Sequence, residues 1–190
     1  MLRPTYPIDT ARLRLRPFRP DDLDALLGIQ SRDDVTQFLY WGARTRDAVQ
    51  TALSERVRQN VIHREGDKLI LAVERRDTEV LIGDVNLVWL SRDNRQDETG
   101  FVLHPDHHGN GFARESAEVM LRLGFEELEL HRIIGRCDGR NTASTKVMEK
   151  LGMRHEAHFR QNEIVKGEWT DEIVYALLAD EWKARQSRRP

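Results

Sequence analysis

A glycine-bearing segment in the second half of the chain has the composition of an anion-binding turn. Gly109 and Gly111 allow the backbone to turn tightly and to approach a ligand closely. The helix predicted to follow has first-turn amides without intrahelical partners, and its dipole adds partial positive charge at that end. A short Gly-x-Gly is equally typical of a strand-to-helix turn that needs glycine for steric reasons alone. The segment that could bind phosphate comprises His108, Gly109, Asn110, Gly111, Phe112 and Ala113.

The residues beside these glycines argue against two common nucleotide-binding loops. An ATP-binding P-loop places Lys and then Ser or Thr at the helix start, whereas Gly111 is followed by Phe112 and Ala113. A dinucleotide-binding fold begins with parallel strand-helix-strand units, whereas this chain opens with two predicted helices and a meander of strands. We therefore expect a phosphate-bearing ligand of another class.

Three histidines in the same stretch could indicate a metal centre; they are His104, His107 and His108. Zinc enzymes of the H-E-x-x-H kind combine paired histidines with a carboxylate at helical spacing, and no such pattern accompanies these three. We therefore expect no metal.

The elements that position the turn follow from hydrophobic periodicity. Leu13 and Leu15 alternate with arginines, which predicts a strand with one apolar face. Helices are predicted after Pro20 and after Thr45, which is placed to act as an N-cap. Further strands are expected at residues 69–73, 80–90, 99–103, 133–137, 155–161 and 172–178, and further helices at 111–128 and 141–151.

Composition limits the class of protein. The 190 residues are 39% hydrophobic and 33% charged, which is typical of a single folded domain over residues 1–190, with a polar tail over 183–190 expected to fray. A formal net charge of −2 argues against nucleic-acid binding. No run of 18 uncharged apolar residues predicts a membrane span, and the single Cys137 cannot form an internal disulfide. We expect a cytoplasmic monomer or homodimer in which Cys137 is a small core residue.

Several motifs together resemble one enzyme superfamily. The turn from His108 to Ala113 resembles the Q/R-x-x-G-x-G/A pyrophosphate loop of the GNAT superfamily of N-acetyltransferases, with His108 at the position of Gln or Arg. Leu103 to Ala117 is similar to the D-P-x-x-W-G-x-G-Y-A-x-E-A run of its RimJ/RimL-type ribosomal-protein N-acetyltransferase branch. The first strand of that branch is matched by Leu13 to Pro17. Its N-x-x-S…E-K-L-G-F motif is similar to Asn141, Ser144, Lys150, Leu151, Gly152 and Met153. Its closing G-x-W-x-D…Y motif resembles Gly167, Glu168, Trp169, Asp171 and Tyr175.

The resemblance implies an α/β (α+β) fold with a central mixed, mostly antiparallel sheet of about seven strands, flanked by about four helices. It also implies that acetyl-CoA lies in a cleft where the fourth strand splays from the fifth. The resemblance implies no metal in this site. There the backbone of Phe101, Val102 and Leu103 would hold the pantetheine arm and polarise the thioester carbonyl, and the loop would bind the diphosphate mainly through its amides. Asn141 resembles the residue that hydrogen-bonds the pantetheine, and it is equally suited to be a helix N-cap.

Acyl transfer to an amine needs a base for the ammonium proton and an acid for the leaving thiolate. Glu98, at the head of the strand before the loop, is the candidate base; Asp97 competes closely, and a solvated turn carboxylate is the alternative interpretation. Many superfamily members use a tyrosine seven residues after the position of Asn141, where this chain has Met148. In the RimJ/RimL branch the serine matched by Ser144 is the proposed donor, although Ser144 also fits an ordinary first-turn serine.

The resemblance predicts transfer of acetyl to a primary amine. The acceptor is either a protein N-terminal amine or a small-molecule amine such as an antibiotic, a polyamine or an amino acid. Aromatic side chains could form the wall of an acceptor pocket or belong to the core; they are Tyr40, Trp41, Trp89 and Trp169. The missing tyrosine leaves two alternatives open, a non-catalytic acyl-CoA-binding or sensing module and a structural partner protein with a vestigial loop.

Overall fold

The alternation of leucine and arginine near the start of the chain forms strand β2 (Leu13–Pro17), in which Leu13 and Leu15 are fully buried. Arg16, expected on the polar face, is only 6% exposed. Its guanidinium donates to the carboxylates of Asp22 and Glu74, at 2.8 and 2.9 Å. The charge can be buried because it is paired and hydrogen-bonded on both sides.

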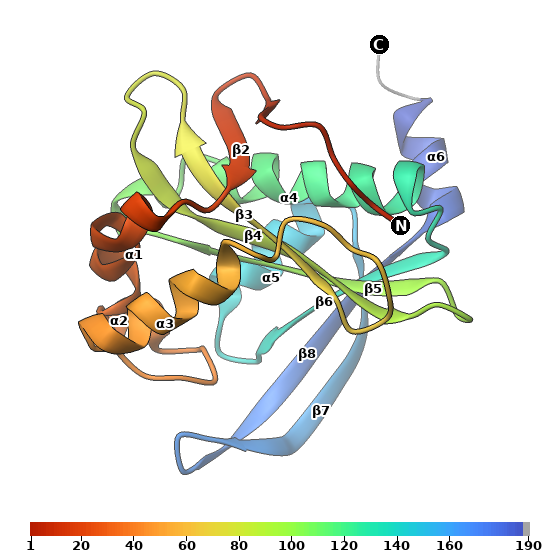
Figure 1. Ribbon diagram of the computed structural model, residues 1–190. Coiled ribbons are helices and arrows are strands. Elements are labelled where there is room, and N and C mark those ends of the chain that lie inside the picture. Colours follow the sequence, from red (N-terminus) through yellow and green to blue (C-terminus); the bar gives the residue numbers. More distant parts are fainter. Residues whose placement is uncertain (188–190) are drawn as a thin grey trace.

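The computed structural model describes residues 1–187, and these residues contain one sheet of eight strands (Figure 1). The strands lie in the order β1-β2-β3-β4-β5-β6-β8-β7, and all neighbours are antiparallel except β5 and β6. Their bounds are β1 (Ile8–Asp9), β2 (Leu13–Pro17), β3 (Lys68–Arg75), β4 (Leu81–Ser91), β5 (Gln96–Leu103), β6 (Arg132–Asp138), β7 (Arg154–Val165) and β8 (Glu168–Leu178).

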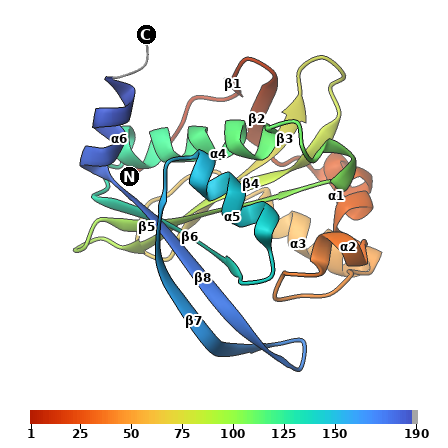
Figure 2. The same cartoon turned by 180° about the vertical axis from the view of Figure 1, so that it is seen from behind.

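Helices cover both faces of this sheet. Helices α1 and α3 pack against one face, and α4 and α5 lie on the other, in front of the sheet in the reverse view (Figures 1 and 2). Helix α4 continues into a π-helical turn, Leu123–Glu127. The α-helices are α1 (Leu23–Gln30), α2 (Asp33–Thr36), α3 (Arg46–Arg56), α4 (Phe112–Arg122), α5 (Thr142–Lys150) and α6 (Ala179–Gln186), and 3-10 turns lie at Pro20–Asp22 and Pro105–His107.

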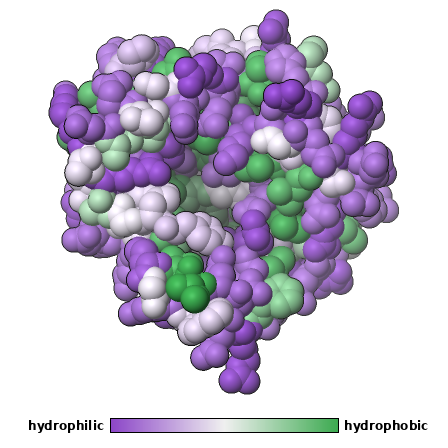
Figure 3. All heavy atoms as spheres, turned by 60° about the horizontal axis from the view of Figure 1, so that its bottom comes forward, coloured by the Kyte–Doolittle hydropathy of each residue, from purple (hydrophilic) through white to green (hydrophobic). Residues whose placement is uncertain are grey.

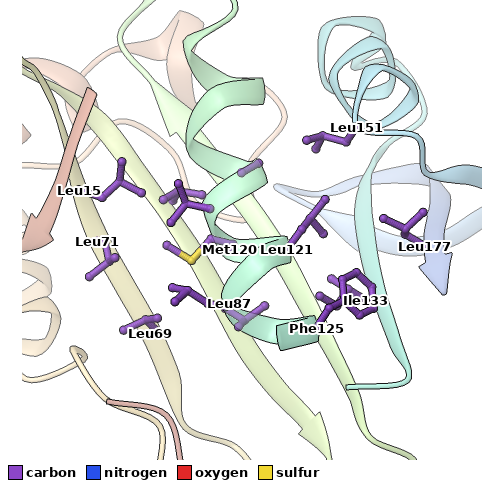
Figure 4. Close-up of a cluster of buried hydrophobic side chains, with 14 of the residues drawn as sticks. Leu15, Leu69, Leu71, Leu87, Met120, Leu121, Phe125, Ile133, Leu151 and Leu177 are labelled. Carbon is purple, nitrogen blue, oxygen red and sulfur yellow. The ribbon is translucent and has the colours of Figure 1, made fainter. Parts of the chain in front are cut away.

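The main hydrophobic core lies between α4 and the sheet (Figure 4). Met120 and Leu121 of α4 are fully buried there, as are Leu71 of β3 and Leu87 of β4. Burial of each such side chain stabilises the fold by roughly 1.5–3 kcal/mol relative to exposure. The helix that follows the glycine turn is therefore held firmly against the strands that precede it.

The observed fold confirms the expected class and adds small elements. The mixed, mostly antiparallel sheet has eight strands rather than about seven, because the two-residue β1 also pairs with β2. Residues 1–187 contain six α-helices rather than about four. Of the tail expected to fray over 183–190, the part up to Gln186 belongs to α6, and residues 188–190 lie outside the described part of the chain. None of the helices in this part combines the length and apolar character needed to cross a bilayer.

Strands β5 and β6 separate after a short shared stretch. Their parallel pairing covers only Gln96–Glu98 against Arg132–Ile134. β5 then continues to Leu103 beside β4 alone. Among residues 1–187, the edge of β5 that faces β6 therefore has no partner strand from Thr99 onward, in agreement with the expected splay. We call this opening the wedge. It leads directly to the glycine turn.

Candidate functional site

The glycine turn joins β5 to α4 through two left-handed residues. Gly109 and Gly111 adopt φ angles of +77° and +81°, a region in which a Cβ atom is unfavourable. Gly111 is the N-cap of α4. A Cβ atom built on Gly109 would meet no heavy atom within 4 Å. The chain thus presents an open backbone surface at the start of the helix.

Most backbone amides of this turn lack acceptors within residues 1–187. The amide of His108 donates to Pro105 at 2.9 Å, and the amide of Glu115 donates to Gly111 at 3.0 Å. The amides between them, from Gly109 to Arg114, have no such partner. They lie at the end of α4 where the helix dipole favours negative charge, so the turn can donate to an anion.

His108 braces the turn through its side chain. Its ring nitrogen Nε2 lies 2.9 Å from the carbonyl oxygen of Leu103, at the end of β5. The side-chain amide of Asn110 donates to the His108 carbonyl at 3.0 Å. The side chain of Phe112 is buried at 7% exposure, so Phe112 can offer a ligand little beyond its backbone. The predicted coenzyme contact of Phe112 is therefore a backbone contact.

Helix α5 begins on the other side of the wedge. The side chain of Asn141 accepts a hydrogen bond from the backbone amide of Ser144 at 3.0 Å, so Asn141 is the N-cap of α5. This bond leaves the Asn141 side-chain N–H groups and the half-buried Ser144 hydroxyl available for other partners. Met148 is buried and packs against Gly135 of β6, where a Cβ atom would come within 2.6 Å of its sulfur.

Glu98 is half-buried and ion-paired rather than solvated. Both Nε and Nη2 of Arg136 donate to its Oε2, at 3.0 and 2.7 Å. Arg136 also donates to Glu172 at 3.1 Å, and the amide of Asn162 donates to the same carboxylate at 3.1 Å. The hydrogen bond to Glu98 is the largest cause of the raised pKa of Arg136, so the cation persists at all physiological pH values. Arg136 could not be predicted from local sequence, because only the pairing of β6 with β5 brings it beside Glu98.

Asp97 faces the opposite side of β5 from Glu98, as alternation along a strand requires. It is fully buried, and neither of its carboxylate oxygens has a hydrogen-bond partner within residues 1–187. The indole nitrogen of Trp89, the residue opposite Asp97 on β4, is likewise buried without a hydrogen-bond partner in this part of the chain. Burial raises the pKa of Asp97 to about 7. The expectation that Asp97 competes with Glu98 from a polar turn does not match this buried position.

The tip of the β7–β8 hairpin reaches across to the end of α2. Lys166 Nζ donates to the carbonyl of Thr36 at 2.6 Å and to that of Gln37 at 3.2 Å. The Tyr40 hydroxyl donates to Glu163 of β7 at 3.1 Å. The molecular surface is hollowed near its centre when the side from which this hairpin projects is brought forward (Figure 3).

The aromatic residues expected at an acceptor pocket lie in different environments. Tyr40 and Trp169 are exposed, at 64% and 61%. Trp41 lies under the guanidinium of Arg44, 3.9 Å from the ring centroid. Trp89 packs against the main core. Of these four, Trp169 belongs to the hairpin itself, on β8, and Tyr40 is hydrogen-bonded to the hairpin through Glu163.

Cys137 is half-buried against the main core. Burial, together with the charges of Asp138 and Glu172, raises the pKa of its thiol to about 11. Because the thiolate is the nucleophilic form, the raised pKa disfavours reaction of Cys137 at neutral pH, in agreement with the interpretation as a core residue.

A surface cavity of about 630 Å³ lies beside the glycine turn, on the β2 side. Its lining includes Arg12, Arg14, Arg75, Arg76 and Phe112. No residue of β6 contributes to it, so it is distinct from the wedge. Across residues 1–187, no group of three or more His, Cys, Asp or Glu side chains is arranged to hold a metal ion.

Known proteins resemble this chain along most of its length. Residues 12–154 match the family model described as an acetyltransferase (GNAT) domain. The chain is 35% identical over 176 residues to the uncharacterized N-acetyltransferase YnaD of Bacillus subtilis, a match covering 92% of this chain and 98% of that protein. A GNAT-family acetyltransferase structure from Bacillus anthracis superimposes with a TM-score of 0.83 at 30% identity, covering 92% of this chain and 99% of the other. Together with the wedge and the glycine turn, these matches show that the chain belongs to the GNAT acetyltransferase family and is an acyltransferase.

Proposed function

We propose that the protein transfers acetyl from acetyl-CoA directly to a primary amine. One observation carries the proposal: the unpaired edge of β5 runs into a turn in which the amides from Gly109 to Arg114 have no acceptor among the described residues. A continuous line of backbone donors suits a ligand that combines amide groups with a diphosphate, as coenzyme A does. The backbone of Phe101, Val102 and Leu103 would contact the pantetheine arm, and the turn from His108 to Ala113 would hold the diphosphate.

Glu98 is the proposed base, and its ion pair determines how it would act. Arg136 holds the Oε2 atom, so Oε1 is the atom that would accept the ammonium proton, directly or through a water molecule. Glu98 also lies where the pairing of β5 with β6 ends, at the closed end of the wedge. An amine that reaches this end of the wedge would lie beside the carboxylate.

Ser144 is the proposed acid for the leaving thiolate. The buried Met148 occupies the position of the superfamily tyrosine, and a thioether has no proton to donate. The backbone amide of Ser144 is engaged by the Asn141 cap, whereas its hydroxyl is not part of that bond. Asn141 would serve two purposes, as the helix cap through its oxygen and as a pantetheine donor through its nitrogen.

A protein N-terminal amine is the first candidate acceptor. Support comes from the resemblance to the RimJ/RimL branch and from a match of 30% identity over 106 residues with a putative ribosomal N-acetyltransferase, YdaF of Bacillus subtilis, covering 56% of this chain and 58% of that protein.

A small-molecule amine is the second candidate acceptor. The chain is 30% identical over 91 residues to the spermidine N(1)-acetyltransferase of Vibrio cholerae, covering 48% of this chain and 53% of that protein. The Glu98, Glu163 and Glu172 carboxylates beside Tyr40 also suit a cationic substrate, although Arg136 neutralises part of their charge.

Release of free CoA tests both candidates. The protein is incubated with acetyl-CoA and with short lysine-free peptides whose N-terminus is either free or blocked, in parallel with polyamines and amino acids. Faster thiol release with peptides whose N-terminus is free than with blocked peptides or small amines supports a protein N-terminal amine as acceptor. Faster release with polyamines or amino acids supports a small-molecule amine. No release above background with any amine would contradict the proposal.

A glycine variant links this reaction to the turn. Gly111→Trp should abolish CoA binding, because a side chain at a positive φ would block the backbone approach. Gly66→Trp is the matched control, since Gly66 has a φ of +88° and an open surrounding but lies far along the chain from the turn. Equal affinity for CoA in the two variants would remove the turn from the proposal.

A further inference from the structure

We infer that Arg12 is the positioning residue that holds the glycine turn in its anion-binding conformation, and that Glu115 fixes Arg12 in turn. The inference rests on the proposed binding of acetyl-CoA at this turn. Arg12 stands in the tight turn between β1 and β2, and Glu115 stands in the first turn of α4. Two segments 103 residues apart in the sequence therefore meet beside the proposed coenzyme site.

Glu115 is anchored by donors from the β1–β2 turn. Its Oε1 accepts from the Thr10 hydroxyl at 2.6 Å and from the Arg12 amide at 2.9 Å. Its Oε2 accepts from Arg12 Nε at 2.8 Å and lies 2.6 Å from Nη2. Burial acts to raise the pKa of Glu115, but these hydrogen bonds outweigh it and lower the pKa, so the carboxylate is ionised. The paired contact fixes the Arg12 guanidinium in one orientation.

The remaining nitrogen of this guanidinium reaches the turn itself. Arg12 Nη1 donates to the carbonyl of Asn110 at 2.9 Å. In a planar trans peptide the carbonyl and the following amide point in opposite directions. Holding the Asn110 carbonyl toward Arg12 therefore directs the Gly111 amide away from Arg12. That amide is one of those without an acceptor, so Arg12 sets the direction in which the turn offers a donor.

Arg12 also contacts the next two residues of the junction. Its Nη2 would lie 3.5 Å from a Cβ atom built on Gly111. Its guanidinium carbon lies 4.7 Å from the ring centroid of Phe112, the first residue of α4. One side chain thus spans three consecutive residues where the turn becomes a helix. The Arg12 side chain is itself 51% exposed, so its contacts serve this junction more than the core.

Two variants separate a positioning role from a general structural one. Arg12→Gln removes the charge that reaches Asn110. Arg14→Gln is the matched control, because Arg14 lies on the adjoining strand and pairs with Asp9 instead of the turn. CoA is titrated by calorimetry, and steady-state kinetics are measured with acetyl-CoA and the best amine.

The expected result is a split between the kinetic constants. Loss of one charge-assisted hydrogen bond should raise the Kd for CoA and the KM for acetyl-CoA roughly tenfold or more in Arg12→Gln. The KM for the amine should stay unchanged, and kcat should change less than the KM for acetyl-CoA. Arg14→Gln should match the wild type in all four constants. A general loss of folded protein would lower activity without producing this split.

The proposed function and the inference fail in different ways. If the wild type binds no CoA, the proposed function is wrong and the role of Arg12 falls with it. If the wild type binds CoA and Arg12→Gln binds it as tightly as Arg14→Gln does, the role of Arg12 alone is overturned. Should Arg12→Gln not fold, Arg12→Lys and Glu115→Gln replace it. Lysine keeps the charge but cannot bridge two partners in a fixed fork, so an unchanged KM for acetyl-CoA in both would overturn the inference.

Discussion

Arg136 holds a single oxygen of Glu98 with two of its guanidinium nitrogens, at 2.7 and 3.0 Å. This arrangement fixes the carboxylate of Glu98 and leaves its Oε1 atom outside these two hydrogen bonds. Because Arg136 is also bonded to Glu172, its own position is set by two anions. The proposed base is therefore oriented by its neighbours before any substrate enters.

Glu98→Gln should lower kcat by about 10²-fold or more, the usual contribution of a general base. The KM for acetyl-CoA should stay near the wild-type value, since the glycine turn is unchanged. Glu156→Gln is the matched control, because Glu156 makes a comparable ion pair with Arg132 on the same strand as Arg136. Initial rates of thiol release measure both variants, and equal rates would exclude Glu98 as the base.

Ser144→Ala should lower kcat without lowering stability, because the Asn141 cap uses the Ser144 backbone amide and not its hydroxyl. Asn141→Ala should instead lower the free energy of unfolding by about 1 kcal/mol, the usual cost of losing an N-cap. Urea unfolding and thiol release measured on both variants distinguish the two effects. A Ser144→Ala enzyme with wild-type kcat at all pH values would assign the acid to another group.

The burial of Asp97 should give the protein an unusual dependence of stability on pH. Its pKa is raised to about 7 in the folded state, whereas an unfolded aspartate titrates near 3.9, so the folded state binds more protons between these values. The contribution of Asp97 to the free energy of unfolding is therefore fully present below about pH 4. It declines as the pH rises to about 7, by about 4 kcal/mol in total. Asp97→Asn should remove this decline.

Urea unfolding of wild type and Asp97→Asn at pH 5 and pH 8 tests this prediction. The advantage of the variant should be larger at pH 8 than at pH 5, because only the wild type must then bury a charge. The comparison between the two proteins cancels the opposite pH dependence of the paired surface carboxylates. An equal difference at both pH values would show that Asp97 titrates normally.

Gly83→Ala should disturb the end of β5. A Cβ atom on Gly83 would lie 2.1 Å from the Val102 carbonyl oxygen and 2.8 Å from the Leu103 Cα, which are backbone atoms that cannot rotate away. We expect a loss of stability of about 1–3 kcal/mol and weaker CoA binding. Gly28→Ala, at an exposed and unobstructed position of α1, should instead stabilise by up to about 1 kcal/mol. Thermal unfolding and CoA titration compare the two.

Where apolar residues follow a clear period, sequence and structure agree closely. Leu13 and Leu15 predicted β2, and the helix expected at 111–128 is observed as α4 with the π-helical turn that follows it. The N-caps expected at Thr45 and Asn141 are also observed. Local patterns of this kind depend on residues close in sequence, which explains why they could be predicted.

The features that sequence did not reveal depend on partners far along the chain. Arg16 is buried because Glu74, 58 residues away, supplies a carboxylate. Helix α6 is held by Trp182, which stacks on Phe125 at 5.7 Å, although its segment has little apolar period. The outer part of the β7–β8 hairpin is mostly exposed, so it lacks the alternation that would have predicted its full length.

The candidate site likewise combines features that local sequence predicts with features that depend on distant partners. The glycine turn was evident from residue types, because only glycine accepts its backbone angles without strain. The environments of Asp97 and Glu98, adjacent in sequence, depend on which face of β5 each occupies and on what β4 and β6 place opposite. Arg12 and Glu115 had no local signal, because their contact joins the beginning of the chain to its middle.

The contact of Lys166 with Thr36 and Gln37 has a mechanical consequence. It joins the end of a long hairpin to a short helix from the opposite half of the sequence. An outward movement of either element would therefore break both hydrogen bonds of Lys166. An acceptor large enough to displace the hairpin would therefore have to break both bonds.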